Sequence, residues 1–145
     1  MRWSSRIPTE HQEQVTVMQW AHAMYLIFPE ACLMFAIANG GLRPQRLTEK
    51  KGELRQYSPE GKKLRAEGVK AGVPDLLLPV ARHGYHGLFI EMKRQGGSMS
   101  HEQASWFGFL TAQGYAVCVC RGADAAIKTI SEYLSKENQW CANEK

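Results

Sequence analysis

Two short apolar runs joined by a tight turn constrain the fold of this chain most. They cover residues 75–81 and 87–93, with "RHGYH" between them. Apolar runs of this length, bounded by glycine and polar turn residues, are typical of buried strands, so the pair predicts a β-hairpin. Three charged residues interrupt the pattern: Asp75 opens the first run, and Glu91 and Lys93 lie in the second. Burying an unpaired charge is unfavourable, so these three residues are the first candidates for a functional site.

Strand alternation and hairpin register determine whether the three charges meet. Alternate residues of a strand share a face, so Glu91 and Lys93 point the same way. A hairpin folded about Gly84 places position 75 opposite position 93, and position 77 opposite position 91. Asp75 is then one diagonal step from Glu91. A register shift of one residue would turn Asp75 to the other face. The other face of the second strand is apolar and is made by Leu88, Ile90 and Met92.

Two carboxylates and a lysine at a strand end are suited to phosphodiester hydrolysis. Carboxylate oxygens are the ligands that Mg²⁺ and Mn²⁺ prefer, and a bound cation lowers the pKa of the attacking water. A neighbouring ammonium group adds positive potential to the transition state. The alternative is an ordinary turn aspartate at position 75 and a surface ion pair between Glu91 and Lys93.

The remaining elements follow from capping and periodicity. Thr9 and Gln12 form a capping-box pattern that starts a helix, which Pro29 ends, and its inner face carries polar groups at one end: Glu10, Glu13 and Gln14. Ser100 and Gln103 start a second helix, which stops at Gly114. Strands are expected at 32–39 and 115–120, a final helix at 123–134, and a long loop at 42–72 with one short helix starting at Ser58-Pro59. This order predicts an α/β fold, a mixed β-sheet flanked by helices on both faces.

The positive charge of the chain is concentrated in one segment. The formal net charge is +4, whereas residues 39–72 contain nine Lys or Arg against four Glu. Such a segment is either a phosphate-binding face or a solvated surface. The best candidates for contacts to a DNA backbone lie just before the proposed site in sequence: Lys62, Lys63, Arg65 and Lys70.

Composition also predicts the class of protein. We expect one domain over residues 1–145, with a basic loop region at 39–72 and a frayed tail at 136–145. No apolar stretch is long enough for a membrane span, and the N-terminus lacks a signal-peptide pattern, so an intracellular, cytoplasmic protein without a membrane partner is expected. The four cysteines lack zinc-site spacing, which predicts free thiols and no zinc.

Three segments together resemble a known nuclease family. They are "GVKAGVPDLLLPV", "GLFIEMKRQGGSMSHEQ" and "GYAVCVCRGADAAIKTISEYL". They resemble the VRR-NUC domain family of the PD-(D/E)xK nuclease superfamily, and the similarity covers nearly the whole chain. The resemblance implies a restriction-endonuclease-like core with Asp75 and Glu91 as ligands of Mg²⁺ or Mn²⁺ and Lys93 as the catalytic lysine. It also implies a bacterial or phage-infected cell.

The resemblance extends to the first helix. "TEHQEQ" is similar to an E-x-x-x-Q pattern of the family, which maps to Glu10 and Gln14 and implies Glu10 as a further catalytic and metal-binding residue. Glu13 competes for that role, and all three also fit ordinary polar residues of a helix start. Gln103 matches a glutamine that follows the lysine in the family, although its place in a capping box explains it equally well.

The predicted function is a metal-dependent DNA endonuclease that is selective for branched DNA such as four-way junctions. Stand-alone members of the family resemble junction-resolving enzymes, and a homodimer would supply the two symmetric cuts that a junction needs. A nonspecific or flap nuclease is the first alternative. The second is a non-catalytic DNA-binding protein that retains the nuclease fold.

Overall fold

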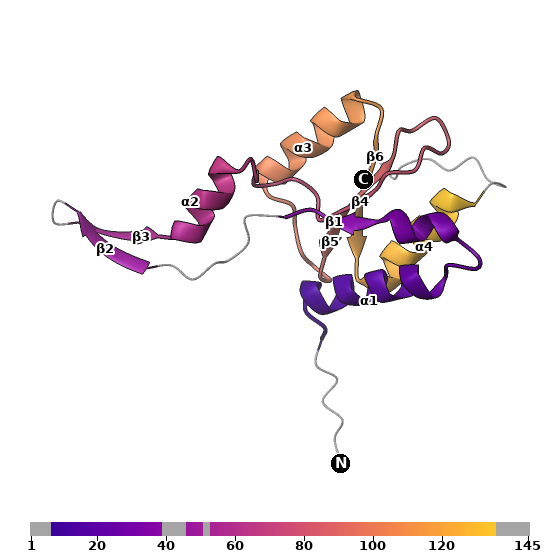
Figure 1. Ribbon diagram of the computed structural model, residues 1–145, viewed down its shortest axis with the longest axis horizontal. Coiled ribbons are helices and arrows are strands. Elements are labelled where there is room, and N and C mark those ends of the chain that lie inside the picture. The colour runs from indigo at the N-terminus through magenta and orange to yellow at the C-terminus, as the bar shows by residue number, and fades with distance from the viewer. Residues whose placement is uncertain (1–6, 39–45, 51–52, 136–145) are drawn as a thin grey trace, which may run out of the picture.

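A four-stranded sheet forms the centre of the protein (Figure 1). The structure is a computed structural model of the 145-residue chain, and it describes residues 7–38, 46–50 and 53–135. Along the chain the elements are α1 (Glu10–Ala23), the 3₁₀ helix η1 (Pro29–Leu33), β1 (Phe35–Ala36), β2 (Arg46–Lys50), β3 (Glu53–Tyr57), α2 (Pro59–Ala66), β4 (Leu76–Leu78), β5 (Leu88–Lys93), α3 (His101–Ala112), β6 (Ala116–Arg121) and α4 (Ala123–Leu134).

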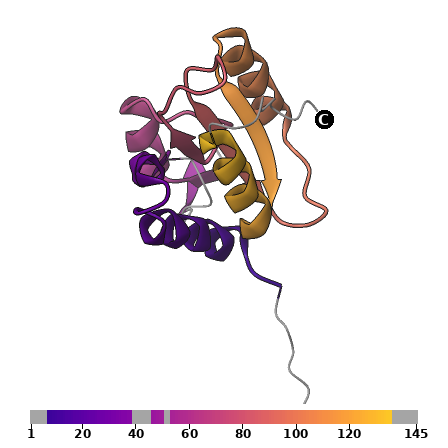
Figure 2. The same ribbon diagram turned by 90° about the vertical axis from the view of Figure 1, so that its right-hand side faces the viewer.

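The sheet is mixed, as the sequence predicts. Its strand order is β1-β4-β5-β6, in which β4 pairs antiparallel with β1 and β5, and β5 pairs parallel with β6. The parallel pair needs a crossover connection, which α3 provides. Helices α1 and α4 pack against each other, and Figure 2 shows α3 apart from both, beside β6. The predicted α/β class, a mixed sheet flanked by helices, is therefore confirmed.

The hydrophobic core lies between the sheet and the α1–α4 pair. The face of β5 made by Leu88, Ile90 and Met92 is fully buried there, as alternation predicts. Its main partners from the helices are Val17 and Ala21 of α1 and Ala126, Ile130 and Tyr133 of α4. The opposite face of β5 carries Glu91 and Lys93, so the charged residues project away from the core.

The hairpin register differs from the prediction in a way that preserves the faces. Leu76 pairs with Ile90 and Leu78 with Leu88, so one step before the ladder Asp75 lies opposite Glu91 instead of Lys93. The turn has two residues, His83 and Gly84, both with positive φ, 52° and 85°, and is closed by the bridge between Arg82 and Tyr85. Between this bridge and the ladder the first arm has three residues (79–81) and the second has two (86–87), so one extra residue shifts the register further. Such turns match the twist of the flanking strands, and this one is centred earlier than the predicted pivot. Asp75 is therefore closer to Glu91 than the predicted diagonal step.

The helix starts agree with the sequence, whereas two other elements do not. The capping boxes at Thr9 and Ser100, and the Ser58 cap of α2, are present. The strand predicted at 32–39 is reduced to two residues, because Pro29 starts η1 and carries the chain through Leu33. The first helix ends at Ala23, before Pro29, since the backbone turns at Met24.

The expected long loop contains a hairpin. Strands β2 and β3 pair antiparallel, from Arg46 opposite Tyr57 to Lys50 opposite Glu53, so the prediction of a loop was wrong over residues 46–50 and 53–57. In Figure 1 this hairpin and α2 extend away from the sheet. The expected frayed tail at 136–145 lies outside the described residues. In the part of the chain that the structure describes, no helix has the length and apolar character needed to cross a bilayer.

Candidate active site

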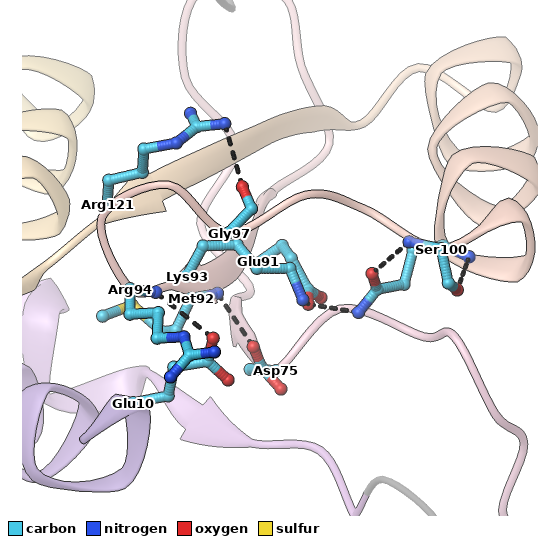
Figure 3. A network of polar contacts seen from close by, with 10 residues as sticks. Glu10, Asp75, Glu91, Met92, Lys93, Arg94, Gly97, Ser100 and Arg121 are labelled. Atoms are coloured by element: carbon cyan, nitrogen blue, oxygen red, sulfur yellow. Dashed lines mark hydrogen bonds and ion pairs between the residues drawn. The ribbon is translucent and has the colours of Figure 1, made fainter.

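Side chains from three separate segments meet at the end of β5 where Lys93 lies (Figure 3). Glu91 and Lys93 come from β5 itself, Asp75 from the residue before β4, and Glu10 from the first turn of α1. Asp75 and Glu10 both lie near enough to Glu91 to raise the pKa of its carboxyl group. The structure therefore brings together the four residues that the sequence nominates for catalysis.

Glu91 is the buried centre of the group. The residue is only 1 % exposed. Its Oε1 accepts hydrogen bonds from Lys93 Nζ at 3.0 Å and from Gln103 Nε2, whereas Oε2 is buried without a hydrogen-bond partner among the described residues. Burial and the nearby charge of Asp75 raise the pKa of Glu91 to about 7, against the opposing effect of Lys93. The site thus concentrates negative charge that a single lysine does not neutralise.

Asp75 is held by the backbone of the neighbouring strand. Its Oδ2 accepts a hydrogen bond from Met92 N at 2.8 Å, and it follows the buried Pro74. Gly72 allows this segment to approach α3, because a Cβ at Gly72 would lie 2.8 Å from the backbone of Glu102, and its φ is 82°. The "GVPD" stretch is therefore fitted closely between α3 and β5.

Glu10 and Glu13 of α1, the two candidates for the third carboxylate of the site, have different hydrogen-bond partners. Glu10 Oε1 accepts a hydrogen bond from Arg94 N at 3.2 Å, which places its carboxylate beside the end of β5. Glu13 Oε2 accepts from Ala123 N at 2.7 Å, at the start of α4, whose N-cap Gly122 has no side chain to offer. Glu13 thus caps another helix and supports its N-terminus. This geometry favours Glu10 for the site.

The two predicted supporting glutamines occupy different environments. Gln103 has both of the roles that its sequence position suggested, in the capping box and at the site. Its Oε1 accepts a hydrogen bond from Ser100 N at 2.8 Å in the capping box, and its Nε2 donates to Glu91. Gln14 is half-buried and lines a groove on α1 with His11 and Met18. No hydrogen bond joins Gln14 to the carboxylates in the described part of the chain.

The predicted DNA contacts lie apart from the carboxylates, in and just after α2. The side chains of Lys62, Lys63, Arg65 and Lys70 are exposed. Arg65 and Lys70 line a pocket of about 400 Å³ together with Leu64 and Val69. Trp106 of α3 donates from Nε1 to Ala71 O at 3.1 Å, which ties this basic segment to the helix that carries Gln103.

The candidate ligands are of the type that a divalent cation needs. As the side chains stand, no three His, Cys, Asp or Glu residues of the described chain form a cluster ready to hold a metal ion. The chemistry of the donors nevertheless fits Mg²⁺ or Mn²⁺, because all three candidate ligands are carboxylates. The unpartnered Oε2 of Glu91, and the burial and carboxylate repulsion that raise the pKa of Glu91, are features that a cation would compensate.

The sequence did not predict the contacts of the loop that follows β5. Arg94 binds Glu10 through its backbone N–H, and Arg121 donates from its guanidinium to Gly97 O at 3.3 Å. A hydrogen bond from a backbone N–H does not depend on the type of residue, so the sequence gives no indication of it. The only available signal was the neighbourhood of "KRQGG", a glycine-containing turn directly after the lysine of the E-x-K pattern.

Comparison with known proteins identifies the family of the chain. The sequence profile of the VRR-NUC domain matches residues 8–124. A solved structure named "VRR_NUC domain protein" is similar over 88 % of this chain and 89 % of its own, with 31 % identity and a TM-score of 0.65. No curated protein matches the chain. Members of the family are nucleases that act on DNA and generally depend on divalent metals. The chain therefore belongs to the VRR-NUC family of the PD-(D/E)xK nuclease superfamily.

Proposed function

We propose that the protein is a Mg²⁺- or Mn²⁺-dependent endonuclease that hydrolyses phosphodiester bonds in branched DNA. One observation carries the hydrolytic part of this proposal. The buried Glu91 carboxylate lies beside Asp75, Glu10 and Lys93, and its Oε2 has no partner among the described residues. A buried carboxylate of this kind is unfavourable unless a bound cation compensates its charge. The whole chain of residues 1–145 is proposed to form one nuclease domain.

Each residue has a proposed role. Asp75, Glu91 and Glu10 would hold the cation, which when bound stabilises negative charge on the phosphate and lowers the pKa of water. The hydrogen bonds from Met92 N to Asp75 and from Arg94 N to Glu10 fix two of these carboxylates in place. Gln103 orients Glu91, and Gln14 is proposed as a supporting residue on the same helix as Glu10.

Lys93 is proposed as the catalytic cation of the chain itself. Its Nζ lies 3.0 Å from Glu91 Oε1, and its side chain is only 12 % exposed. The ammonium group is therefore held on the face of β5 where the carboxylates meet. From there it can donate a hydrogen bond to the attacking water or to a phosphate oxygen as negative charge develops. Lysine is not a ligand of hard cations, so its role is separable from metal binding.

A homodimer acting on four-way junctions is the proposed active assembly. A junction needs two symmetric cuts, and a two-fold dimer supplies two sites through one repeated interface. Large exposed apolar side chains between α1 and the edge strand β1 offer a surface for this contact, namely Tyr25, Leu26, Ile27, Leu33 and Phe35. The basic residues Lys62, Lys63, Arg65 and Lys70 are proposed to contact the DNA backbone and to read its shape.

Two other functions are compatible with the same fold. A nonspecific or flap nuclease would use the same carboxylates and lysine without a preference for junctions. A non-catalytic DNA-binding protein would retain the fold alone. The second alternative leaves the burial of Glu91 among Asp75, Glu10 and Lys93 without a purpose, which is why catalysis is the preferred proposal.

A cleavage assay tests the proposed chemistry. Labelled four-way, flap and linear DNA are incubated with Mg²⁺ or Mn²⁺ and with four variants: Asp75→Ala, Glu91→Ala, Lys93→Ala and Lys128→Ala. The first three should lose cleavage. Lys128 is an exposed residue of α4, so its variant is the matched control for the loss of one positive charge and should retain cleavage. Substantial cleavage by Asp75→Ala in saturating Mg²⁺ would overturn the site.

The assembly is tested separately from the chemistry. Light scattering at micromolar concentration should give the mass of a dimer, and Leu26→Ser with Ile27→Ser should shift it toward the monomer. The side chains of Leu26 and Ile27 are 92 % and 66 % exposed, so these changes spare the core. A monomer that cuts linear duplex as fast as the junction would exclude the junction-resolving function while leaving the nuclease intact.

A further inference from the structure

A groove lies beyond the end of β5, next to the candidate active site. One wall is made by residues 7–11 at the start of α1, and the other by residues 94–97 of the loop after β5. Its volume is about 720 Å³. This is within the range of pockets that hold small ligands and is large enough for a nucleotide.

The groove adjoins the carboxylates through Glu10. The Glu10 side chain lines the groove, accepts a hydrogen bond from Arg94 N at 3.2 Å, and contributes to the raised pKa of Glu91. Figure 3 shows Arg94 and Glu10 beside Lys93 at this end of the strand. A DNA strand whose phosphate lies at Lys93 and the carboxylates would therefore continue into the groove.

Hydrogen bonds fix the loop that forms the second wall to β6. Gln95 Nε2 donates to Arg121 O at 3.3 Å, and the Arg121 guanidinium donates to Gly97 O at 3.3 Å. Within the loop, Gly97 N donates to Arg94 O at 3.0 Å. A preformed wall reduces the conformational entropy that is lost on binding.

Arg94 offers the groove a partner for a phosphate group, on the wall opposite the Glu10 carboxylate. Arg94 is exposed and lies on its wall, and a guanidinium group binds phosphate oxygens through paired hydrogen bonds. Among the described residues that line the groove there is no Phe, Tyr or Trp, and His11 supplies the one imidazole ring. A site of this kind contacts the DNA backbone and gives little base preference.

We propose that this groove holds the nucleotide next to the scissile phosphate, and that the Arg94 guanidinium binds the phosphate of that nucleotide. Arg121 is a positioning residue that holds the loop. The inference rests on the proposed nuclease function, since it requires DNA at the carboxylates. It adds a strand contact at the catalytic end of β5 that is distinct from the basic residues of α2.

Binding measurements test the contact without cleavage. Lys93→Ala serves as an inactive background, and fluorescence anisotropy measures its affinity for labelled four-way DNA over a range of salt concentrations in Mg²⁺. Adding Arg94→Ala should weaken binding and reduce the slope of log K against log salt by about 0.9, the value for one phosphate contact. Adding Lys128→Ala, which removes an exposed cation of α4, should change neither quantity. Equal affinity and slope with and without Arg94 would overturn the proposal.

Cleavage of modified DNA locates the contact. Neutral methylphosphonate linkages are placed one at a time beside the cut position. In the active protein, one position should raise KM with little change in kcat, and Arg94→Ala should be insensitive to that same substitution. Sensitivity that is unchanged in Arg94→Ala would assign the contact to another residue and sink the proposal. If no DNA is cut while the Arg94 effect on binding persists, the groove stands and the proposed catalysis fails.

Discussion

The side-chain amide of Gln103 donates a hydrogen bond to Glu91 Oε1 while its own oxygen accepts from Ser100 N at 2.8 Å. The backbone N–H can only donate, so it fixes which end of the amide faces the carboxylate. The capping box of α3 thereby sets the donor that meets the most buried carboxylate of the site.

This arrangement predicts different effects at two neighbouring residues. Gln103→Ala should lower cleavage and raise the metal concentration needed for half-maximal activity, because Glu91 loses a donor that orients it. Ser100→Ala removes the capping hydroxyl but leaves the N–H that fixes Gln103. It should cost about 1 kcal/mol of stability and leave the metal requirement unchanged. Urea unfolding and metal titrations of both variants measure these effects; a shifted metal requirement in Ser100→Ala alone would contradict the assignment.

The raised pKa of Glu91 predicts a stability that depends on pH in metal-free protein. Its pKa is raised from 4.5 to about 7, so between these values the folded state binds more protons than the unfolded state. The free energy of unfolding should be highest below pH 4.5 as far as Glu91 contributes, and should fall as pH rises toward 7. The full effect is at most roughly 3 kcal/mol.

Urea unfolding in EDTA at closely spaced pH values measures this dependence. Glu91→Gln keeps an acceptor for Lys93 and Gln103 but does not titrate, so this fall in stability should disappear in it. A curve of the same shape in Glu91→Gln would assign the pH dependence to other groups.

Asp75→Asn should have opposite effects on stability and on metal binding. The asparagine oxygen can still accept from Met92 N, whereas the charge that raises the pKa of Glu91 is lost. In EDTA at pH 7 the variant should be more stable than the wild type. Mg²⁺ at 100 times its dissociation constant should stabilise the wild type by about 2.7 kcal/mol and the variant far less. Thermal unfolding with and without Mg²⁺ tests both parts, and equal stabilisation of the two proteins would remove Asp75 from the metal site.

Glu10 and Glu13 form a matched pair on one helix. Glu10→Gln should strongly reduce cleavage with little change in stability, because its carboxylate is proposed to bind the metal. Glu13→Gln keeps an acceptor for Ala123 N and should be close to wild type, whereas Glu13→Ala should cost about 1 kcal/mol through the lost cap of α4. Activity and urea unfolding of the three variants decide the assignment; the reverse ranking of Glu10→Gln and Glu13→Gln would exchange the two roles.

The sequence predicted those helices and strands that are determined by residues close together in the chain. The boxes at Thr9 and Ser100 depend on side chains three residues apart, and both helices start where the sequence indicates. The alternation of β5 depends only on strand geometry, so its charged face was also predictable. The register was less so, because it depends on the turn at His83 and Gly84 and on one extra residue in the first arm between that turn and the ladder.

Tertiary contacts explain what the sequence did not reveal. Glu10 and Glu13 both fit a polar helix start, and only the positions of Arg94 N and Ala123 N distinguish them. The hairpin of β2 and β3 lacks the apolar alternation that identifies a strand beside a core, so composition favoured a loop. Within the described residues its strands form a two-stranded sheet that is separate from the main sheet.

The alternation of β5 has a consequence for how the sequence of the protein can evolve. Positions 88, 90 and 92 face the core, whereas 89, 91 and 93 face the other side of the sheet. A variant library restricted to positions 91 and 93 would mainly change the chemistry of the site, while one restricted to the even positions would sample folding competence with the reactive groups retained. One six-residue strand thus separates much of the heritable variation in chemistry from that in foldability, with the buried Glu91 subject to both.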